Sequence, residues 1–265
     1  MRKMRMIRQR FRELKNKKQA GLICYYTAGF PDLDKSMENI ELLCSSGADI
    51  IEIGVPFSDP VADGPVIQQA SLKALESGVT LHKILDAVSH LNLSVPIVLM
   101  SYLNPVLRFS LPAFFKNAKH TGISGVIFPD LPAEESGDIR ESAEREEIDT
   151  IFLCAPTSSK ERIKLNSSLS TGFVYCVTVA GVTGMRSGIP AKARELIEQV
   201  KAFTDVPCAA GFGISNSEQI KGFSQIADGV IVGSRILDAV MKSENLKTIV
   251  REFKQSTIKN TGGTN

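Results

Sequence analysis

The chain has 265 residues, of which 43% are hydrophobic and 23% are charged, a composition typical of a globular protein. This length fits one α/β barrel, so we expect a single domain over residues 1–265. No apolar stretch reaches the roughly 18 residues that a membrane span needs, and the N-terminus lacks the apolar core of a secretory signal. The five cysteines lie far apart and the three histidines are scattered, which argues against a disulfide framework and a histidine-based metal site. We therefore expect a cytoplasmic protein that holds no metal.

The first segment of the chain is strongly basic. Residues 1–18 carry nine Lys or Arg and one acid, although the net charge of the whole chain is only +2. Met4, Ile7, Phe11 and Leu14 recur at helical spacing, which predicts an amphipathic helix. A targeting peptide, a nucleic-acid arm or a membrane-surface helix are alternatives. We expect a helix packed on the domain with a solvated basic face, and neither a nucleic-acid nor a membrane partner.

From Gly21 onward, a short apolar run, a Gly/Pro/Asp-rich loop and a segment of helical period repeat about every 22 to 35 residues. This rhythm predicts βα units and a (β/α)8 barrel. The eight expected strands are Leu22–Thr27, Asp49–Ile53, Ile97–Ser101, Gly125–Phe128, Thr150–Cys154, Phe173–Val177, Cys208–Ala210 and Gly229–Val232. Amphipathic helices are expected at Ser36–Cys44, Leu111–Lys119, Ala133–Glu146, Ala191–Phe203 and Ser215–Phe223. A doubly wound open sheet is the alternative, but fewer strands and a glycine fingerprint after the first would be expected.

About 45 residues separate the second and third expected strands, which is longer than the other intervals. Two helical stretches, Val66–Ser77 and Leu81–Leu91, lie in this interval. We therefore expect an extra helix after the second strand. At the other end of the chain, we expect residues 259–265 to form a disordered tail.

Two carboxylates stand out in and after the second strand. Glu52 is the only ionisable residue among isoleucines, and alternation turns it away from Ile51 and Ile53, into the barrel. It lies toward the C-terminal end of its strand, where barrel enzymes place catalytic groups, and burial there raises a carboxyl pKa. Asp63 follows in a loop rich in proline. Two carboxylates in different environments are typical of general acid/base catalysis, although an ion pair and a plain turn are the structural alternatives.

Glycine-bearing loops follow the last three expected strands, where barrels bind phosphate groups. These loops are Ala180–Gly184, Ala210–Ser215 and Val232–Ile236. Gly213 and Gly233 let the backbone approach an anion and Ser234 adds a hydroxyl, whereas tight turns alone are the simpler explanation. No lysine ends an expected strand, which argues against a Schiff base. The residues thus predict an enzyme that acts on a phosphorylated small molecule without a metal or organic cofactor, and leave isomerase and carbon–carbon lyase chemistry open.

The runs ADIIEIGVPFSDPVADGPVIQ, FPDLPAEES, GVTG and AGFGIS closely resemble the tryptophan synthase alpha subunit family, in register from about Gly21 to Glu252. The resemblance implies retro-aldol cleavage of indole-3-glycerol phosphate to indole and glyceraldehyde 3-phosphate. It implies that Glu52 protonates C3 of the indole and assists removal of the glycerol hydroxyl proton. Asp63 is implied to bind the indole N–H and stabilise the cationic intermediate.

The resemblance also assigns substrate-binding residues and a partner. The residues that match the family's substrate site are Tyr175, Thr183, Gly184, Phe212, Gly213, Gly233 and Ser234, with Thr183 in a mobile loop that is implied to contact Asp63 on closure. The implied partner is a beta subunit that carries pyridoxal phosphate, in an allosteric αββα heterotetramer. Pro56–Pro60 and Asn104–Leu107 are implied to lie near that interface.

Three positions depart from the family pattern. Ala180 stands where relatives commonly have Ser or Thr, and Cys24 and Tyr25 stand where Pro and Phe are frequent. An alternative is therefore a catalytically weak alpha subunit that acts mainly as an allosteric activator of the beta subunit. An unrelated phosphate-binding barrel isomerase is a further alternative, against which the run from Glu52 to Asp63 argues.

Overall fold

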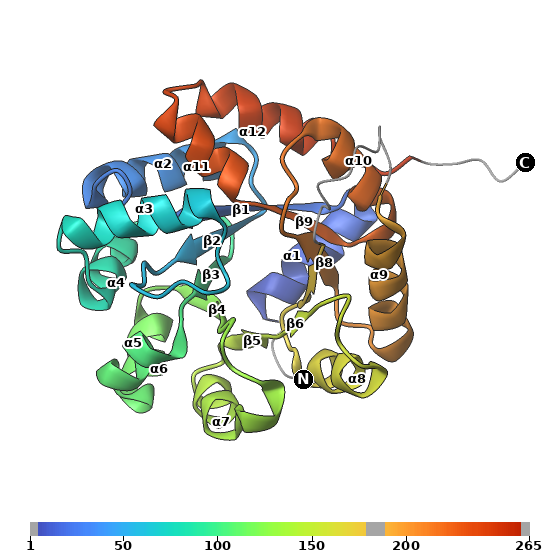
Figure 1. Cartoon of the computed structure of the whole chain (residues 1–265), viewed down its shortest axis with the longest axis horizontal. Coiled ribbons are helices and arrows are strands. Elements are labelled where there is room, and N and C mark those ends of the chain that lie inside the picture. The colour runs from blue at the N-terminus through green and yellow to red at the C-terminus, as the bar shows by residue number, and fades with distance from the viewer. Residues whose placement is uncertain (1–4, 179–188, 261–265) are drawn as a thin grey trace, which may run out of the picture.

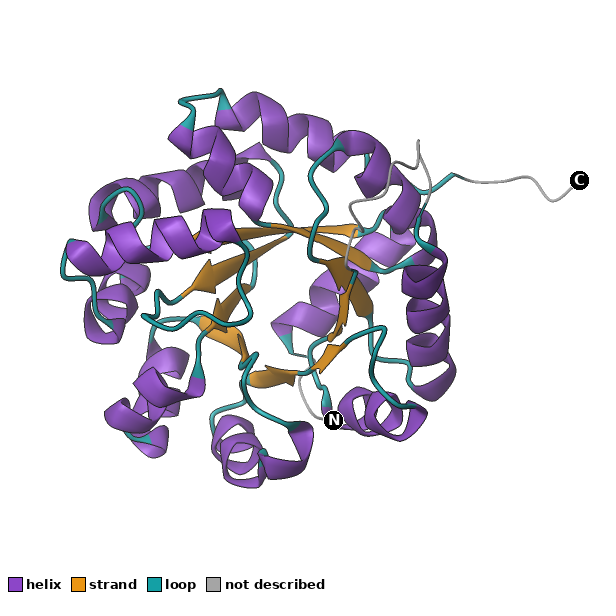
Figure 2. Ribbon diagram, in the orientation of Figure 1, coloured by secondary structure: helices purple, strands orange, loops and turns teal. Residues whose placement is uncertain are grey.

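The computed structural model describes residues 5–178 and 189–260. In this part of the chain, a ring of parallel strands lies inside a ring of helices (Figure 2). The strands are β1 (Gly21–Thr27), β2 (Ile50–Gly54), β3 (Ile97–Met100), β4 (Ile123–Ile127), β5 (Asp149–Ile151), β6 (Leu153–Cys154), β7 (Val174–Val177), β8 (Cys208–Gly211) and β9 (Gly229–Val232). Their order is β5-β4-β3-β2-β1-β9-β8-β7-β6. The predicted (β/α)8 barrel is confirmed.

The fifth predicted strand, Thr150–Cys154, differs from expectation because it is split at Phe152. Its first half pairs with β4 and its second half with β7, so this one stretch joins the two edges of the sheet. The carbonyl of Phe152 accepts a hydrogen bond of 3.0 Å from the backbone N–H of Tyr175 at the junction. The chain changes partner here, and this closes the barrel.

The helices are α1 (Met6–Asn16), α2 (Leu33–Ser46), α3 (Pro65–Glu76), α4 (Leu81–Ser89), α5 (Leu103–Phe109), α6 (Leu111–His120), η1 (Ala133–Glu135), α7 (Gly137–Arg145), α8 (Lys160–Leu169), α9 (Ala191–Phe203), α10 (Ser217–Ile226), α11 (Ser234–Met241) and α12 (Leu246–Gln255). Both α3 and α4 lie between β2 and β3, as the long interval predicts (Figure 1). The prediction of a single helix over Ala133–Glu146 is wrong, because Ser136 separates the 3₁₀ turn η1 from α7. The Ser136 hydroxyl donates to the carbonyl of Ala133 and ends a 3₁₀ turn before α7 begins.

The basic helix α1 closes the N-terminal end of the barrel (Figure 1). Its apolar face, Ile7, Phe11 and Leu14, is buried. Arg5, which precedes α1, and Arg10 within it pair with buried aspartates beside the starts of β5 and β2. Arg5 Nη1 lies 2.9 Å from Asp149 Oδ1, and Arg10 Nη2 lies 2.8 Å from Asp49 Oδ1. The interpretation of this segment as a helix packed on the domain is confirmed over the described residues, which do not include Met4.

Phe11 is the apolar centre of this closure. Its ring lies against the glycines that begin β1 and β9, Gly21 and Gly229, where any side chain would be crowded. We expect Phe11→Ala to lower the free energy of unfolding by about 3–5 kcal/mol, because it leaves a cavity under the barrel. Urea denaturation measures this loss. Met6→Ala, which removes an exposed side chain of the same helix, is the control and should change the free energy of unfolding by less than about 0.5 kcal/mol.

The C-terminal end of the described part of the chain packs beside Lys18, which follows α1, and beside α10. The sequence predicts a disordered tail from residue 259 onward. This prediction is wrong for Lys259 and Asn260, which form hydrogen bonds with the rest of the chain. The N–H of Lys259 donates to the carbonyl of Lys18, and the N–H of Asn260 donates to the side chain of Gln225. The rest of the predicted tail, residues 261–265, lies outside the described residues.

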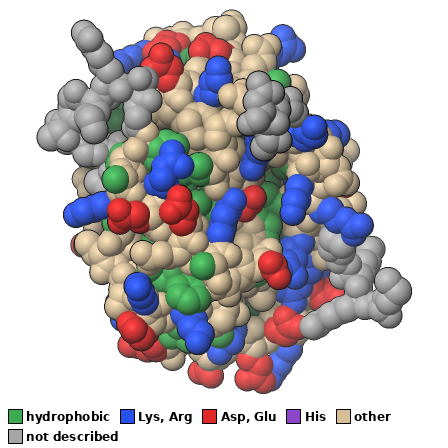
Figure 3. Space-filling model, turned by 90° about the vertical axis from the view of Figure 1, so that its right-hand side faces the viewer, with side chains coloured by type: hydrophobic (Ala, Val, Ile, Leu, Met, Phe, Trp, Pro, Cys, Tyr) green, Lys and Arg blue, Asp and Glu red, His purple; other side chains and the backbone are tan. Residues whose placement is uncertain are grey.

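On the side of the molecule shown in Figure 3, Lys and Arg side chains lie interspersed with Asp and Glu. Mixed charge of this kind is typical of a solvated protein surface.

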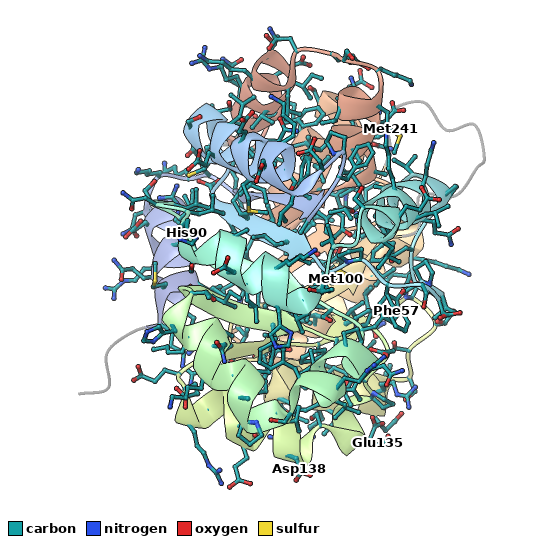
Figure 4. All side chains as sticks on the ribbon, turned by 90° about the vertical axis from the view of Figure 1, so that its left-hand side faces the viewer. Phe57, His90, Met100, Glu135, Asp138 and Met241 are labelled. Carbon is teal, nitrogen blue, oxygen red and sulfur yellow. The ribbon has the colours of Figure 1, made fainter. Side chains whose placement is uncertain are left out.

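Figure 4 shows Phe57, in the loop after β2, on one side of the barrel and His90, at the end of α4, on the other. The Phe57 side is the C-terminal end of the strands, where the candidate site lies.

Candidate active site

A cavity of about 300 Å³ lies at the C-terminal ends of the strands. It is lined by Tyr25, Glu52, Asp63, Gly64, Pro65, Val66, Ile67, Met100, Tyr175, Phe212, Gly213, Ile214, Ile231, Gly233 and Ser234. Seven of the predicted site residues lie in this one cavity, although they come from five separate parts of the chain. Two others, Thr183 and Gly184, lie outside the described residues, as does Ala180.

Glu52 lies in the middle of β2 and points into the barrel. The strand continues to Gly54, so Glu52 is its third residue rather than near its end. The side chain is 1% exposed, and neither carboxyl oxygen has a hydrogen-bond partner among the described residues. Burial, with a smaller contribution from the charge of Asp63, raises the pKa of Glu52 to about 8. Glu52 is therefore mostly protonated near neutral pH and can donate a proton.

Asp63 lies in the loop between β2 and α3. The hydroxyl of Tyr102 donates to Asp63 Oδ2 at 3.4 Å, and the same hydroxyl accepts a hydrogen bond of 2.9 Å from the N–H of Ala62. The Tyr102 ring stacks on Phe57, with 4.8 Å between ring centroids. Burial raises the pKa of Asp63 to about 6, although the bond from Tyr102 lowers it. The carboxyl group of Asp63 thus ionises more readily than that of Glu52.

Sequence reasoning missed Tyr102. It lies two residues after β3, at the end of the barrel where side chains converge, and that position is the signal that could have found it. Through Ala62 and Asp63 its hydroxyl holds the loop after β2 against the loop after β3.

Two tyrosines face the cavity, one from β1 and one from β7. The Tyr25 hydroxyl lies over Gly54, and a Cβ added there would stand 2.1 Å from it. The Tyr175 hydroxyl lies over Gly211 in the same way, at 2.4 Å from an added Cβ. Both glycines are therefore required to make room for a tyrosine from the neighbouring strand. The ring of Tyr175 meets Phe212 edge-on, with centroids 5.7 Å apart, so these two side chains form an aromatic wall.

The loops after β8 and β9 form the opposite end of the cavity. Phe212 and Gly213 both adopt the left-handed backbone region, with φ of +71° and +79°, which turns the chain sharply beside the cavity. Gly233 precedes α11, and Ser234 is the first residue of that helix. The first N–H groups of a helix lack partners within it and favour an anion. Gly213, Gly233 and Ser234 therefore lie where a phosphate group can bind.

The chain matches a family model described as "Tryptophan synthase alpha chain" over residues 11–262. It belongs to the tryptophan synthase alpha chain family. A tryptophan synthase alpha chain of Dehalococcoides mccartyi is 43% identical over 244 residues, which cover 90% of this chain and 96% of that protein. The alpha chain of Carboxydothermus hydrogenoformans is 44% identical over 239 residues, which cover 89% of this chain and 90% of that protein. The structure of Mycobacterium tuberculosis tryptophan synthase gives a TM-score of 0.90 at 35% identity, covering 97% of this chain and all of that chain.

Among the described residues of this tryptophan synthase alpha family member, no helix is both long and apolar enough to cross a membrane. In the same part of the chain, no cluster of three or more His, Cys, Asp or Glu side chains could hold a metal ion.

Proposed function

We propose that the chain is the alpha subunit of a tryptophan synthase and cleaves indole-3-glycerol phosphate to indole and glyceraldehyde 3-phosphate in tryptophan biosynthesis. The observation that carries the proposal is a buried, unpartnered Glu52 in the same cavity as Asp63, with the loops after β8 and β9 at the other end. Family membership indicates which substrate is cleaved, and the cavity contains the acid/base groups that its cleavage requires.

In the proposed reaction, protonated Glu52 donates its proton to C3 of the indole ring. The ring nitrogen becomes cationic, and Asp63 accepts a hydrogen bond from the indole N–H and stabilises that charge. The bond between C3 and the glycerol carbon then breaks, and its electron pair returns to the ring. The adjacent hydroxyl loses its proton to Glu52 and becomes the aldehyde, so one proton is given and one is recovered.

The remaining cavity residues hold the substrate in the proposal. Tyr175 and Phe212 form the apolar wall for the indole ring, and Gly213, Gly233 and Ser234 receive the phosphate. Thr183 and Gly184 are proposed to complete the site from the loop after β7.

The family implies a beta-subunit partner, and the proposal extends to an αββα heterotetramer with allosteric coupling, in which the partner carries pyridoxal phosphate and this chain no cofactor. Two apolar side chains on the C-terminal side of the barrel support a docking surface there: Val61 is 86% exposed and Leu107 is 51% exposed. These lie at the loop after β2 and in α5, next to the segments implied by the resemblance. A cytoplasmic location is part of the proposal, and five free cysteines support it, because reducing compartments keep thiols unpaired.

The pKa values of the two carboxyl groups predict a bell-shaped pH dependence of kcat/KM. Asp63 acts in its ionised form, so the rate should fall as pH drops through about 6. Glu52 acts as an acid, so the rate should fall as pH rises through about 8. Because the two groups interact, these are apparent values of the pair. A pH profile of indole release that rises steadily from pH 6 to pH 10 would contradict this division of roles.

The proposed function is tested by quantifying indole and glyceraldehyde 3-phosphate released by the purified chain, alone and with its cognate beta subunit at saturation. We expect equal amounts of both products, formed slowly by the chain alone and faster with the partner. No cleavage in either condition, with the beta reaction still stimulated, would instead support a regulatory subunit. A product that retains all the substrate's carbon atoms would indicate an isomerase.

A further inference from the structure

Tyr25 stands between the carboxylates and the phosphate loops. In the strand order, β1 lies between β2 and β9. Tyr25 is the register partner of Glu52 on β2, and Cys24 beside it pairs with Val232, which places Tyr25 level with Gly233 on the other side. Any ligand that reaches from Glu52 to Gly233 inside the barrel must therefore pass over Tyr25.

The ring of Tyr25 spans the distance between these two ends. Its Cβ and Cδ1 lie next to Gly233, at 3.2 Å and 3.0 Å from the position of an added Cβ. Its hydroxyl lies over Gly54, at the end of β2 and the start of the loop that carries Asp63. The apolar part of the side chain thus faces the phosphate end, and the hydroxyl faces the carboxylates.

The Tyr25 hydroxyl has hydrogen-bonding capacity left over. Within the described residues it has a single partner, the Thr27 hydroxyl at 3.2 Å. Thr27 is fully buried. Two hydroxyl groups carry two donors and four acceptor positions, and one shared bond leaves a donor and several acceptor positions unused. Tyr25 lines the cavity beside the carboxylates of Glu52 and Asp63, and neither is a hydrogen-bond partner of its hydroxyl. A polar atom of a ligand bound in the cavity can therefore use the free positions.

We propose that the Tyr25 hydroxyl hydrogen-bonds the substrate's glycerol hydroxyl next to the indole ring, and that Tyr25 is a specificity-determining residue for the hydroxylated side chain. The inference rests on the proposed function. The indole ring lies by Glu52 and Asp63, the phosphate lies by Gly233, and the glycerol chain connects them across Tyr25. The hydroxyl of the glycerol carbon that is bonded to the ring is the one nearest to the carboxylate end, where the Tyr25 hydroxyl lies.

Tyr25→Phe tests this inference, because it removes the hydroxyl and keeps the ring. Two ligands are compared: indole-3-glycerol phosphate and indole-3-propyl phosphate, in which hydrogen atoms replace both glycerol hydroxyls. Binding is measured by calorimetry with the full-length chain in a Glu52→Gln background, so that the substrate is not consumed. We expect the Kd of the glycerol ligand to rise about five- to tenfold, as for a neutral hydrogen bond, while the Kd of the propyl ligand stays within about twofold.

Tyr26→Phe is the matched control, since it removes a hydroxyl from the next residue of the same strand. Tyr26 faces away from the cavity, and its hydroxyl donates to the carbonyl of Phe30 and accepts from Asn39. This variant should lower stability and leave the ratio of the two Kd values unchanged. Thr27→Val is a second variant, which frees the Tyr25 hydroxyl from its partner without touching the cavity wall. It should lower the preference for the glycerol ligand less than Tyr25→Phe does.

Equal weakening of both ligands by Tyr25→Phe would overturn the inference, because it would assign Tyr25 a packing role. An unchanged Kd for both ligands would overturn it as well. Failure of the proposed function has a different signature. A wild-type chain that binds both ligands without releasing indole would contradict the lyase activity, while the ratio of Kd values would still decide the role of Tyr25.

Discussion

Glu52→Gln should lower the kcat of indole release about 10²- to 10⁴-fold, the usual contribution of a positioned general acid. Glutamine has nearly the same shape as the protonated carboxyl group that occupies this position near neutral pH. It cannot give a proton to C3 of the indole or take one from the glycerol hydroxyl. Steady-state kinetics of indole release measure the loss, and KM should change little because the cavity keeps its form. An unimpaired kcat would contradict the role assigned to Glu52.

The same substitution should stabilise the folded chain relative to wild type as pH rises from 5 to 8. The pKa of Glu52 is raised in the folded chain, from 4.5 to about 8, so the folded state favours the neutral form. Its contribution to stability is complete below pH 4.5 and is lost as pH rises through about 8. Glu52→Gln has no such loss, so its free energy of unfolding relative to wild type should increase between pH 5 and pH 8. Urea denaturation across this range measures the difference and also shows that the variant folds.

Asp63→Asn should lower kcat about 10²- to 10³-fold, which is the usual loss when an enzyme loses one oriented group that stabilises transition-state charge. Asparagine keeps the size of the side chain and an oxygen that can accept from Tyr102. It loses the negative charge that stabilises the cationic indole ring. Steady-state indole release by the chain alone measures this effect, without contributions from a partner.

Asp59→Asn is the matched control for Asp63→Asn. Asp59 lies in the same loop but is exposed, and its carboxylate accepts a hydrogen bond from the neighbouring Ser58 hydroxyl. The control should retain nearly the wild-type kcat. If both variants lost activity equally, the loss would come from the loop's conformation, and the charge of Asp63 would have no specific role.

The strands and the two carboxylates could be predicted because their signals are local. Ile51 and Ile53 flank Glu52 in strict alternation, and this fixes the direction of each side chain once the strand forms. The break at Phe152 could not be predicted, because it depends on which two strands meet when the sheet closes. The sequence of α8 has no helical repeat of apolar residues, because Asn166 and Ser167 are among the residues that this helix buries.

The site was less accessible to sequence reasoning where it depends on contacts between distant residues. Tyr102 meets Asp63 across two loops, a pairing that neither segment indicates by itself. Gly54 resembles an ordinary strand glycine until the hydroxyl of Tyr25 is seen to fill the space of its missing side chain. In the sequence, Tyr25 stands out only as a departure from the family pattern, and its position between Glu52 and Gly233 follows from the order of the strands.

The proposed mechanism requires a neutral Glu52 near pH 7, and the titration of this one carboxyl group is the decisive measurement. Carbon-13 NMR of chains labelled at the glutamate carboxyl carbons, recorded for wild type and Glu52→Gln between pH 3 and pH 10, isolates the Glu52 signal as the one that the variant lacks. We expect this signal to titrate near pH 8. A Glu52 signal that titrates near 4.5 would contradict it, because the group would then be ionised at neutral pH and unable to protonate the indole ring.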